Sequence, residues 1–241
     1  MVVILSLILI NILFSQVDSP ESILDSVLNK LAPDKTLGII KQINKYPNKS
    51  ERIFKYEYYA DNIEDSQLIK YIYPNKIKNN SFLLKNNGKD IWAYFSRTRR
   101  TRKLASHITK RGMQDSEFTF QDLSKNRDWL TEYDIKIDNF NEKLFIINLF
   151  LKEDITSVYS KIEIYVDNKN YYPTKIIYYS DNRSQKTMLL ENIRKKESYI
   201  YAKNMRMINN ITNIETEMII ESISFDIKFT EDIFNENRMS K

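Results

Sequence analysis

Residues 90–123 read DIWAYFSRTRRTRKLASHITKRGMQDSEFTFQDL, and the interpretation of the rest of the chain depends on this stretch. It opens with aromatic residues at alternate positions, Trp92 and Tyr94, and closes with a second alternation, Phe118 and Phe120. Seven Lys or Arg side chains lie between the two alternations. Apolar residues at every second position are typical of a strand with one buried face. The stretch therefore predicts a hairpin-like unit in which two aromatic strands flank a basic patch.

Length and composition indicate an ordinary folded domain. The chain has 241 residues, of which 42% are hydrophobic and 29% are charged, as in a globular protein with a substantial core. The 16 Tyr and 12 Phe favour strands. A net charge of +5 and a pI near 9.0 allow an anionic partner. They do not choose between nucleic acid, a membrane surface and an acidic protein.

Several kinds of functional site are excluded by residues that the sequence lacks. Without cysteine, the chain has no disulfide, thiolate metal site or cysteine nucleophile. The single histidine, His107, excludes a multi-histidine metal site and is interpreted as a solvated loop residue. The three glycines lie too far apart for a dinucleotide-binding or phosphate-binding loop. Carboxylates are plentiful, but no spacing singles out a catalytic pair, so we expect no catalytic residue, no metal and no cofactor.

An apolar run at residues 2–14, VVILSLILINILF, has the length of the hydrophobic region of a signal peptide. It is too short to cross a bilayer comfortably. We therefore predict a signal peptide at residues 1–16 and a single mature domain at residues 17–241. No Lys or Arg precedes the run, and cleavage after Ser15 would leave Leu13, not a small residue, three positions back. An uncleaved membrane anchor or a misassigned start codon remains an alternative.

A helix is predicted directly after this run. Ser19, Pro20 and Glu21 supply a capping side chain, a first-turn proline and a carboxylate near the positive end of the helix dipole. Apolar residues then recur at helical spacing as far as Pro33. Residues 35–45 fit either a second short helix or the first strand.

From Arg52 onward the period of the apolar residues changes to two. The predicted strands cover residues 52–60, 67–73, 82–85, 90–96, 143–152, 159–167, 171–180, 186–195, 198–209 and 215–228. Turn signals lie at Asn86-Asn87-Gly88, Asp167-Asn168 and Asp181-Asn182. This pattern predicts a mainly β fold with a few α-helices. A single antiparallel sheet with so many strands curls toward a barrel or a half-barrel.

The basic run supplies candidates for contact with a partner or with lipid headgroups, namely Arg97, Arg99, Arg100, Arg102 and Lys103. Arginines beside aromatic strands are typical of nucleic-acid binding, but an exported protein rarely meets nucleic acid, so none is expected as a partner. Two interpretations stay open. The run contacts an anionic membrane or an acidic protein surface, or it forms a ladder of ion pairs with Glu117 and Asp122 across the hairpin.

The aromatic residues of the central stretch also have two interpretations. Trp92, Tyr94, Phe118 and Phe120 fill a core if the barrel is closed, and they line an apolar cavity if it is half open. Even-numbered and odd-numbered residues of strand 90–96 lie on opposite faces, and the sequence does not say which face is turned inward.

With these features in place, the central stretch resembles the signature of the outer-membrane lipoprotein-sorting family, the LolA-like proteins. That family shows a Trp-hydrophobe-Tyr strand, an Arg-rich turn ending in an aliphatic residue, and then Gly-Ser-Asp-Phe-Ser/Thr-Tyr-x-Asp-Leu. The matching residues are Trp92, Tyr94, Arg99, Arg100, Arg102, Leu104, Ser116, Phe118, Thr119, Asp122 and Leu123. Proline, glycine, aspartate and tyrosine of the signature are replaced by Ser96, Asp115, Glu117 and Phe120.

The resemblance implies an unclosed antiparallel half-barrel that is lidded by helices and holds acyl chains of lipoproteins or other lipids on its concave face. It implies a non-enzymatic carrier in the periplasm, which we expect to be a monomer, delivering its cargo toward the outer membrane. An inner-membrane transporter and an outer-membrane acceptor would be its partners. Each acyl CH₂ costs roughly 0.8 kcal/mol to transfer into water, so such cargo needs a shielded cavity. The alternative function is an accessory or sensor protein docking on an RND-type membrane transporter through residues 97–111.

Overall fold

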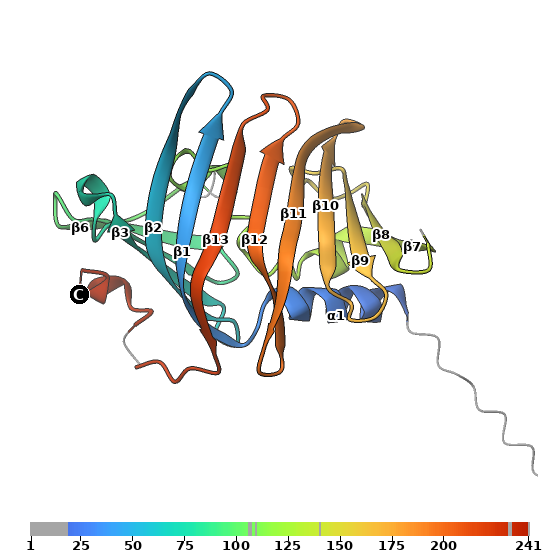
Figure 1. Cartoon of the computed structure of the whole chain (residues 1–241), viewed down its shortest axis with the longest axis horizontal. Helices are drawn as coiled ribbons and strands as arrows, with labels where there is room; N and C mark the ends of the chain where they lie inside the picture. Colours follow the sequence, from blue (N-terminus) through green and yellow to red (C-terminus); the bar gives the residue numbers. More distant parts are fainter. Residues whose placement is uncertain (1–18, 106–107, 109, 140, 231–232, 241) are drawn as a thin grey trace, which may run out of the picture.

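The computed structural model of the chain describes residues 19–105, 108, 110–139, 141–230 and 233–240, so the predicted signal peptide and His107 lie outside the described residues. Its main element is a curved sheet of 13 strands, with the long helix α1 against the concave face (Figure 1).

The helices are α1 (Pro20–Leu31) and α2 (Trp129–Glu132), and the 3-10 turns are η1 (Asn75–Ile77), η3 (Met113–Asp115) and η4 (Glu236–Arg238). The strands are β1 (Lys35–Tyr46), β2 (Lys49–Asp61), β3 (Ser66–Tyr73), β4 (Ser81–Lys85), β5 (Asp90–Phe95), β6 (Arg100–Lys103), β7 (Tyr133–Asn139), β8 (Leu144–Leu151), β9 (Lys161–Asp167), β10 (Pro173–Ser180), β11 (Arg183–Lys196), β12 (Tyr199–Asn209) and β13 (Glu215–Phe225).

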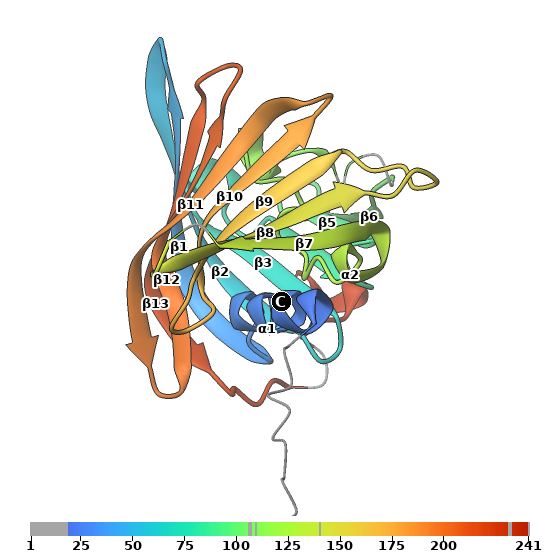
Figure 2. The ribbon, with the colours of Figure 1, turned by 90° about the vertical axis from the view of Figure 1, so that its right-hand side faces the viewer.

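The strands form two meanders that meet at the centre of the sheet. β1 to β6 follow one another in one direction, β13 to β7 follow in the other, and β1 pairs antiparallel with β13. The edge strands β6 and β7 are not neighbours, so the sheet curls around α1 without closing (Figure 2). The predicted fold class, a mainly β protein with an unclosed half-barrel, is confirmed.

Helix α1 begins where the sequence predicts. The Ser19 hydroxyl accepts a hydrogen bond from the Ser22 backbone N–H at 3.2 Å and caps the first turn. Leu24, Val27 and Leu28 are buried, while α1 contacts β7, β12 and α2. The apolar stripe of this helix therefore faces the inside of the half-barrel.

The sequence pattern leaves one strand open and misses two others. Residues 35–45, predicted as either a second short helix or the first strand, lie in β1 at the centre of the sheet. All four residues of β6 are exposed, so no apolar alternation marks this strand. Its charges also keep an open sheet edge from pairing with other chains. β7 does carry an alternation, at Tyr133, Ile135 and Ile137, and the prediction missed it.

The second aromatic alternation of the central stretch is not a strand. β5 pairs with β6, whereas Phe118 and Phe120 lie in an irregular segment held by an isolated bridge between Gly112 and Thr119. Both rings are at most 2% exposed. The expected pairing of two aromatic strands is therefore wrong. The segment that follows the basic run folds back into the half-barrel because its phenylalanines are buried there.

Asp115 occupies the position where the family signature has glycine. Its φ is +60°, and φ at the preceding residue, Gln114, is +51°. This left-handed region is open to glycine without a steric penalty, and Asp tolerates it better than bulkier residues do. The Asp115 carboxylate also pairs with Arg52 at 2.6 Å. Asp115 therefore adopts a backbone conformation that also suits the glycine of the signature.

A β-bulge extends the apolar lining of the concave face toward α1. The register between β1 and β13 shifts between Ile39 and Ile40, which makes Glu221 an extra residue in β13. A bulge shifts the in-out alternation by one position. Ile223 and Phe225 are consequently turned to the same cavity as the residues before the bulge.

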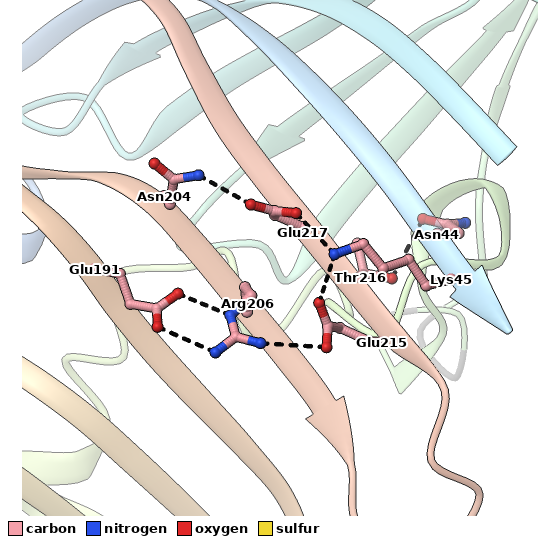
Figure 3. A network of polar contacts seen from close by, with 8 residues as sticks. All are labelled: Asn44, Lys45, Glu191, Asn204, Arg206, Glu215, Thr216 and Glu217. Carbon is pink, nitrogen blue, oxygen red and sulfur yellow. Dashed lines mark hydrogen bonds and ion pairs between the residues drawn. The ribbon is translucent and has the colours of Figure 1, made fainter. Parts of the chain in front are cut away.

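The face of the sheet turned away from α1 carries a charge network across four strands (Figure 3). Lys45 of β1 contacts Glu215 and Glu217 of β13, each at 2.9 Å. Arg206 of β12 donates two hydrogen bonds to Glu191 of β11, at 2.7 and 3.0 Å, and reaches Glu215 at 3.4 Å. The network ties β1, β13, β12 and β11 together at the middle of the sheet.

Candidate functional site: an apolar cavity under helix α1

The structure holds a cavity of about 180 Å³ between α1 and the concave face of the sheet. Its wall is built from α1, the segment 118–129 and strands of both meanders. The apolar lining includes Leu28, Leu31, Ile40, Tyr56, Tyr58, Ile69, Phe118, Leu123, Trp129, Ile176, Tyr178, Met188, Leu190, Met205, Met218 and Ile220. A concave, mostly apolar space of this kind is the usual form of a small-molecule site.

Helix α1 forms one wall of the cavity and is latched by a polar contact. The Arg127 guanidinium pairs with the Asp25 carboxylate and donates to Asn29 Oδ1 at 2.7 Å. The Arg127 and Asp25 side chains are 38% and 44% exposed. Solvent screening makes such pairs weak, so this latch contributes little to the hold on α1. The burial of Leu24, Val27 and Leu28 therefore holds α1 in place more than this polar contact does.

Methionines line the wall formed by the last three strands. Met205 of β12 stands directly opposite Met218 of β13, and Met188 lies on the neighbouring β11. All three line the cavity. Methionine side chains are flexible and polarizable, so they repack around ligands of different shape. This wall therefore suits flexible apolar chains better than one rigid ligand.

Tyr56, Tyr58 and Tyr178 line the cavity as neutral phenols. Burial raises the pKa of each well above its usual value of 10.0, and the nearby charge of Asp122 raises the pKa of Tyr178 further. The Tyr56 hydroxyl donates toward Met218 Sδ at 3.5 Å. The rings therefore add apolar surface without adding charge.

Of the four aromatic residues predicted to line the cavity, Phe118 does so. Phe120 is buried beside Phe82, with ring centroids 5.3 Å apart, and is not among the lining residues. Trp92 and Tyr94 lie on the opposite face of β5, in a second apolar cluster with Leu68, Leu83 and Met239. The expectation for these two residues is therefore corrected.

The reason is that both faces of β5 are covered. Ile91 and Ala93 face the main core, and Trp92 and Tyr94 face the C-terminal segment, which contributes Ile233, Phe234 and Met239 to the second cluster. Alternation shows that one set of residues is buried together. It does not show which side of a curved sheet buries them.

The five basic candidates, Arg97, Arg99, Arg100, Arg102 and Lys103, are exposed on the β5–β6 hairpin. Lys103 contacts Asp90 at 2.6 Å and lies 5.0 Å from the Trp92 ring centroid. Within the described part of the chain, the four arginines form no ion pair.

The proposed partners of a basic ladder are engaged elsewhere. Asn209 donates to the Glu117 carboxylate at 3.0 Å, and Lys186 pairs with Asp122 at 3.3 Å. The ladder with Glu117 and Asp122 is therefore not formed. The hairpin arginines are left available to an external anion.

Sequence reasoning did not single out three polar residues at one end of the cavity. Thr36, Asn62 and Gln67 line it and are each more than nine-tenths buried. No pattern marks them, because single neutral polar residues within or just after a strand are ordinary surface features.

Two further findings concern the described residues. Among them, no group of three or more His, Cys, Asp or Glu side chains is placed to hold a metal ion. In the same part of the chain, no helix combines the length and the apolar character needed to cross a membrane.

Asp122 is the one carboxylate among the described lining residues of the cavity, so no carboxylate pair faces this space.

A family model described as that of an uncharacterized protein matches residues 64–241. The chain belongs to that family. No curated protein matches the sequence.

Solved structures of the same fold cover nearly the whole chain. A domain described as an outer membrane lipoprotein-sorting protein, from Vibrio parahaemolyticus, is 22% identical, with a TM-score of 0.77 over 92% of this chain and 98% of its own. A DUF1329 family protein from Desulfovibrio piger is 16% identical, with a TM-score of 0.77 over 91% and 97%. A LolA superfamily protein from Nitrosomonas europaea is 15% identical, with a TM-score of 0.72 over 91% and 99%. The LolA-like fold expected from residues 90–123 is confirmed.

Proposed function

We propose that this protein is a non-enzymatic periplasmic carrier, which holds acyl chains of lipoproteins or other lipids under α1 and delivers them toward the outer membrane. The observation that carries the proposal is the cavity between α1 and the curved sheet, which is lined by aliphatic, methionine and aromatic side chains. The neighbouring folds support it, since one is described as lipoprotein-sorting and another as LolA superfamily.

The energetics of lipid transfer explain why such a cavity is useful. Each acyl CH₂ gains roughly 0.8 kcal/mol on leaving water, so an apolar wall retains a lipid chain without any chemical step. No carboxylate pair is needed for this task. A carrier, unlike a hydrolase, needs only a cavity that excludes water and an entrance through which the ligand can pass.

The size of the cavity suggests how the entrance for the ligand opens. Pockets for drug-sized ligands measure roughly 300–1,000 Å³. The cavity here is about 180 Å³, which is too small for a long acyl chain. We therefore interpret this conformation as a closed state, in which α1 must shift away from segment 118–129 before a long chain enters.

The remaining parts of the chain take roles within the same proposal. Residues 1–16 act as the export signal, and residues 17–241 form the carrier domain. The unpaired arginines of the β5–β6 hairpin contact anionic headgroups of the membrane that supplies or receives the cargo. No contact or charge pattern among the described residues favours docking on an RND-type transporter.

The proposal is tested by isolating the full chain from its native membrane and periplasmic fractions and analysing bound molecules by lipid mass spectrometry. Titration of delipidated protein with a fluorescent fatty acid accompanies this measurement. We expect co-purified acyl lipid and saturable binding. Absence of both would contradict the carrier function.

A further inference from the structure

We propose that one end of the cavity is a subsite for a head group that donates hydrogen bonds, such as a hydroxyl or an amide N–H on the acyl ligand. The inference rests on the proposed carrier function and adds the chemical class of head group. Three side-chain oxygens carry it: Thr36 Oγ1, Asn62 Oδ1 and Gln67 Oε1. All three are buried, line the cavity and lack a hydrogen-bond partner in the described part of the chain.

Strand register brings these residues to one place. Thr36 of β1 stands opposite Ala60 of β2, and Ala60 stands opposite Gln67 of β3. Directly opposed residues share a face, so Thr36 and Gln67 flank the small Ala60 side chain at about two strand spacings, or about 10 Å. Asn62 lies in the turn that follows β2. Ala60 between them is fully buried and carries only a methyl group.

The orientation of the two amides follows from their other contacts. Asn62 Nδ2 donates to the Pro33 carbonyl at 2.6 Å, and Gln67 Nε2 donates to the Leu123 carbonyl at 3.1 Å. A carbonyl oxygen cannot donate, so each amide nitrogen must face its carbonyl and each amide oxygen must face away from it. The two amide oxygens can therefore only accept, while the Thr36 hydroxyl can also donate, so the subsite favours a ligand group that carries a donor.

Two charged side chains of the cavity lining, Lys125 and Asp122, already have partners. Lys125 pairs with Asp65 at 2.5 Å and donates to the Asn62 carbonyl, and Asp122 pairs with Lys186. The three oxygens are the buried polar groups of the described lining that are left without partners. Buried polar groups are nearly always hydrogen-bonded, so these oxygens are available to a ligand group that satisfies them.

The test compares acyl ligands of equal chain length that differ in the head group: a monoacylglycerol, a primary fatty amide, a fatty-acid methyl ester and the free fatty acid. Each competes with a fluorescent fatty acid for the delipidated full chain. We expect the monoacylglycerol and the amide to bind roughly three- to tenfold more tightly than the methyl ester, which has no donor. The double variant Thr36→Val and Gln67→Met should remove this preference while keeping methyl ester binding.

Gln42→Met is the matched control. Gln42 Oε1 is also buried without a partner, but Gln42 does not line the cavity, so this variant should keep the preference. Equal binding of all four ligands by the unmodified chain would overturn the subsite and leave the carrier function standing. Tightest binding of the ionised acid would also overturn it, in favour of recognition by Lys30 and Lys125. Failure of every ligand to bind would overturn the carrier function itself.

Discussion

Lys186 and Asp122, 64 residues apart in the sequence, form an ion pair of 3.3 Å that ties β11 to the segment covering the cavity. Their side chains are 14% and 1% exposed. Asp122 also accepts a hydrogen bond from the Thr119 backbone N–H at 2.8 Å, and Lys186 donates to the Glu117 carbonyl at 2.8 Å. One buried carboxylate thus organises the turn that follows the basic run.

Replacing Asp122 by Asn should destabilise the protein. The change leaves Lys186 nearly buried without its counter-ion, and removal of one partner from a buried pair costs roughly 3 kcal/mol. Denaturant unfolding measures the loss in free energy. The control is Asp128→Asn, whose pair with Lys89 at 3.3 Å is well exposed and should be worth less than about 1 kcal/mol. Equal losses in the two variants would contradict the role given to Asp122.

Acid should weaken the charge network on the outer face. Burial raises the pKa of Glu217, but the hydrogen bonds from Lys45 and Asn204 lower it more, and the net pKa lies below its usual value of 4.5. A depressed carboxyl pKa stabilises the fold above the unfolded pKa, and this contribution is lost as pH falls through the folded value. The unfolding free energy of Glu217→Gln should therefore fall less steeply than that of the unmodified protein between about pH 5 and about pH 3. Parallel pH profiles would rule this contribution out.

Reversing the charge of Arg99, Arg100 and Arg102 to Glu should abolish association with vesicles that contain anionic lipid. Each basic residue near such a surface contributes about 1 kcal/mol, so the loss should be on the order of 100-fold or more. Flotation or sedimentation with vesicles measures it, while fatty-acid binding in the cavity stays unchanged. Charge reversal of Arg194 and Lys195, exposed on β11, is the control. Vesicle binding that survives in the hairpin variant would remove the headgroup role.

Loosening the α1 latch should speed ligand exchange. Arg127→Met keeps a flexible, unbranched side chain but removes the contacts to Asp25 and Asn29. Because a partly exposed pair is worth up to about 1 kcal/mol, uptake and release of a fluorescent fatty acid should both accelerate roughly three- to fivefold, with little change in affinity. Stopped-flow fluorescence measures these rates. Lys89→Met, beside the same segment, should leave them unchanged, and equal rates in all three proteins would contradict movement of α1.

The sequence sufficed for much of the fold because local signals were strong. The structure contains the Ser19 cap and strands at the segments where apolar residues alternate. It also contains the turns at Asn86-Asn87-Gly88 and Asp181-Asn182, whose residues adopt positive φ. The edge strand β6 escaped prediction because a strand made of exposed charges has no apolar face to mark it.

The site was harder to predict, because a cavity depends on which face of a curved sheet is inside. Trp92 and Tyr94 carry the strongest local signal, yet they pack under the C-terminal segment, which alternation on β5 does not reveal. Conversely, Met188, Met205 and Met218 come together only through the register of three strands. Phe118 is the one of the four aromatic candidates that lies among the described lining residues.

The most direct test of the carrier function replaces a small residue of the cavity wall by a bulky one, so that the new side chain occupies the cavity. Ala202 lines the cavity and is 2% exposed, whereas its neighbour Lys203 is exposed. Binding of a fluorescent fatty acid should weaken about tenfold or more in Ala202→Phe, equivalent to at least about 1.4 kcal/mol, and should be unchanged in Lys203→Phe. A folded Ala202→Phe protein that binds the fatty acid as tightly as the unmodified chain would contradict the account.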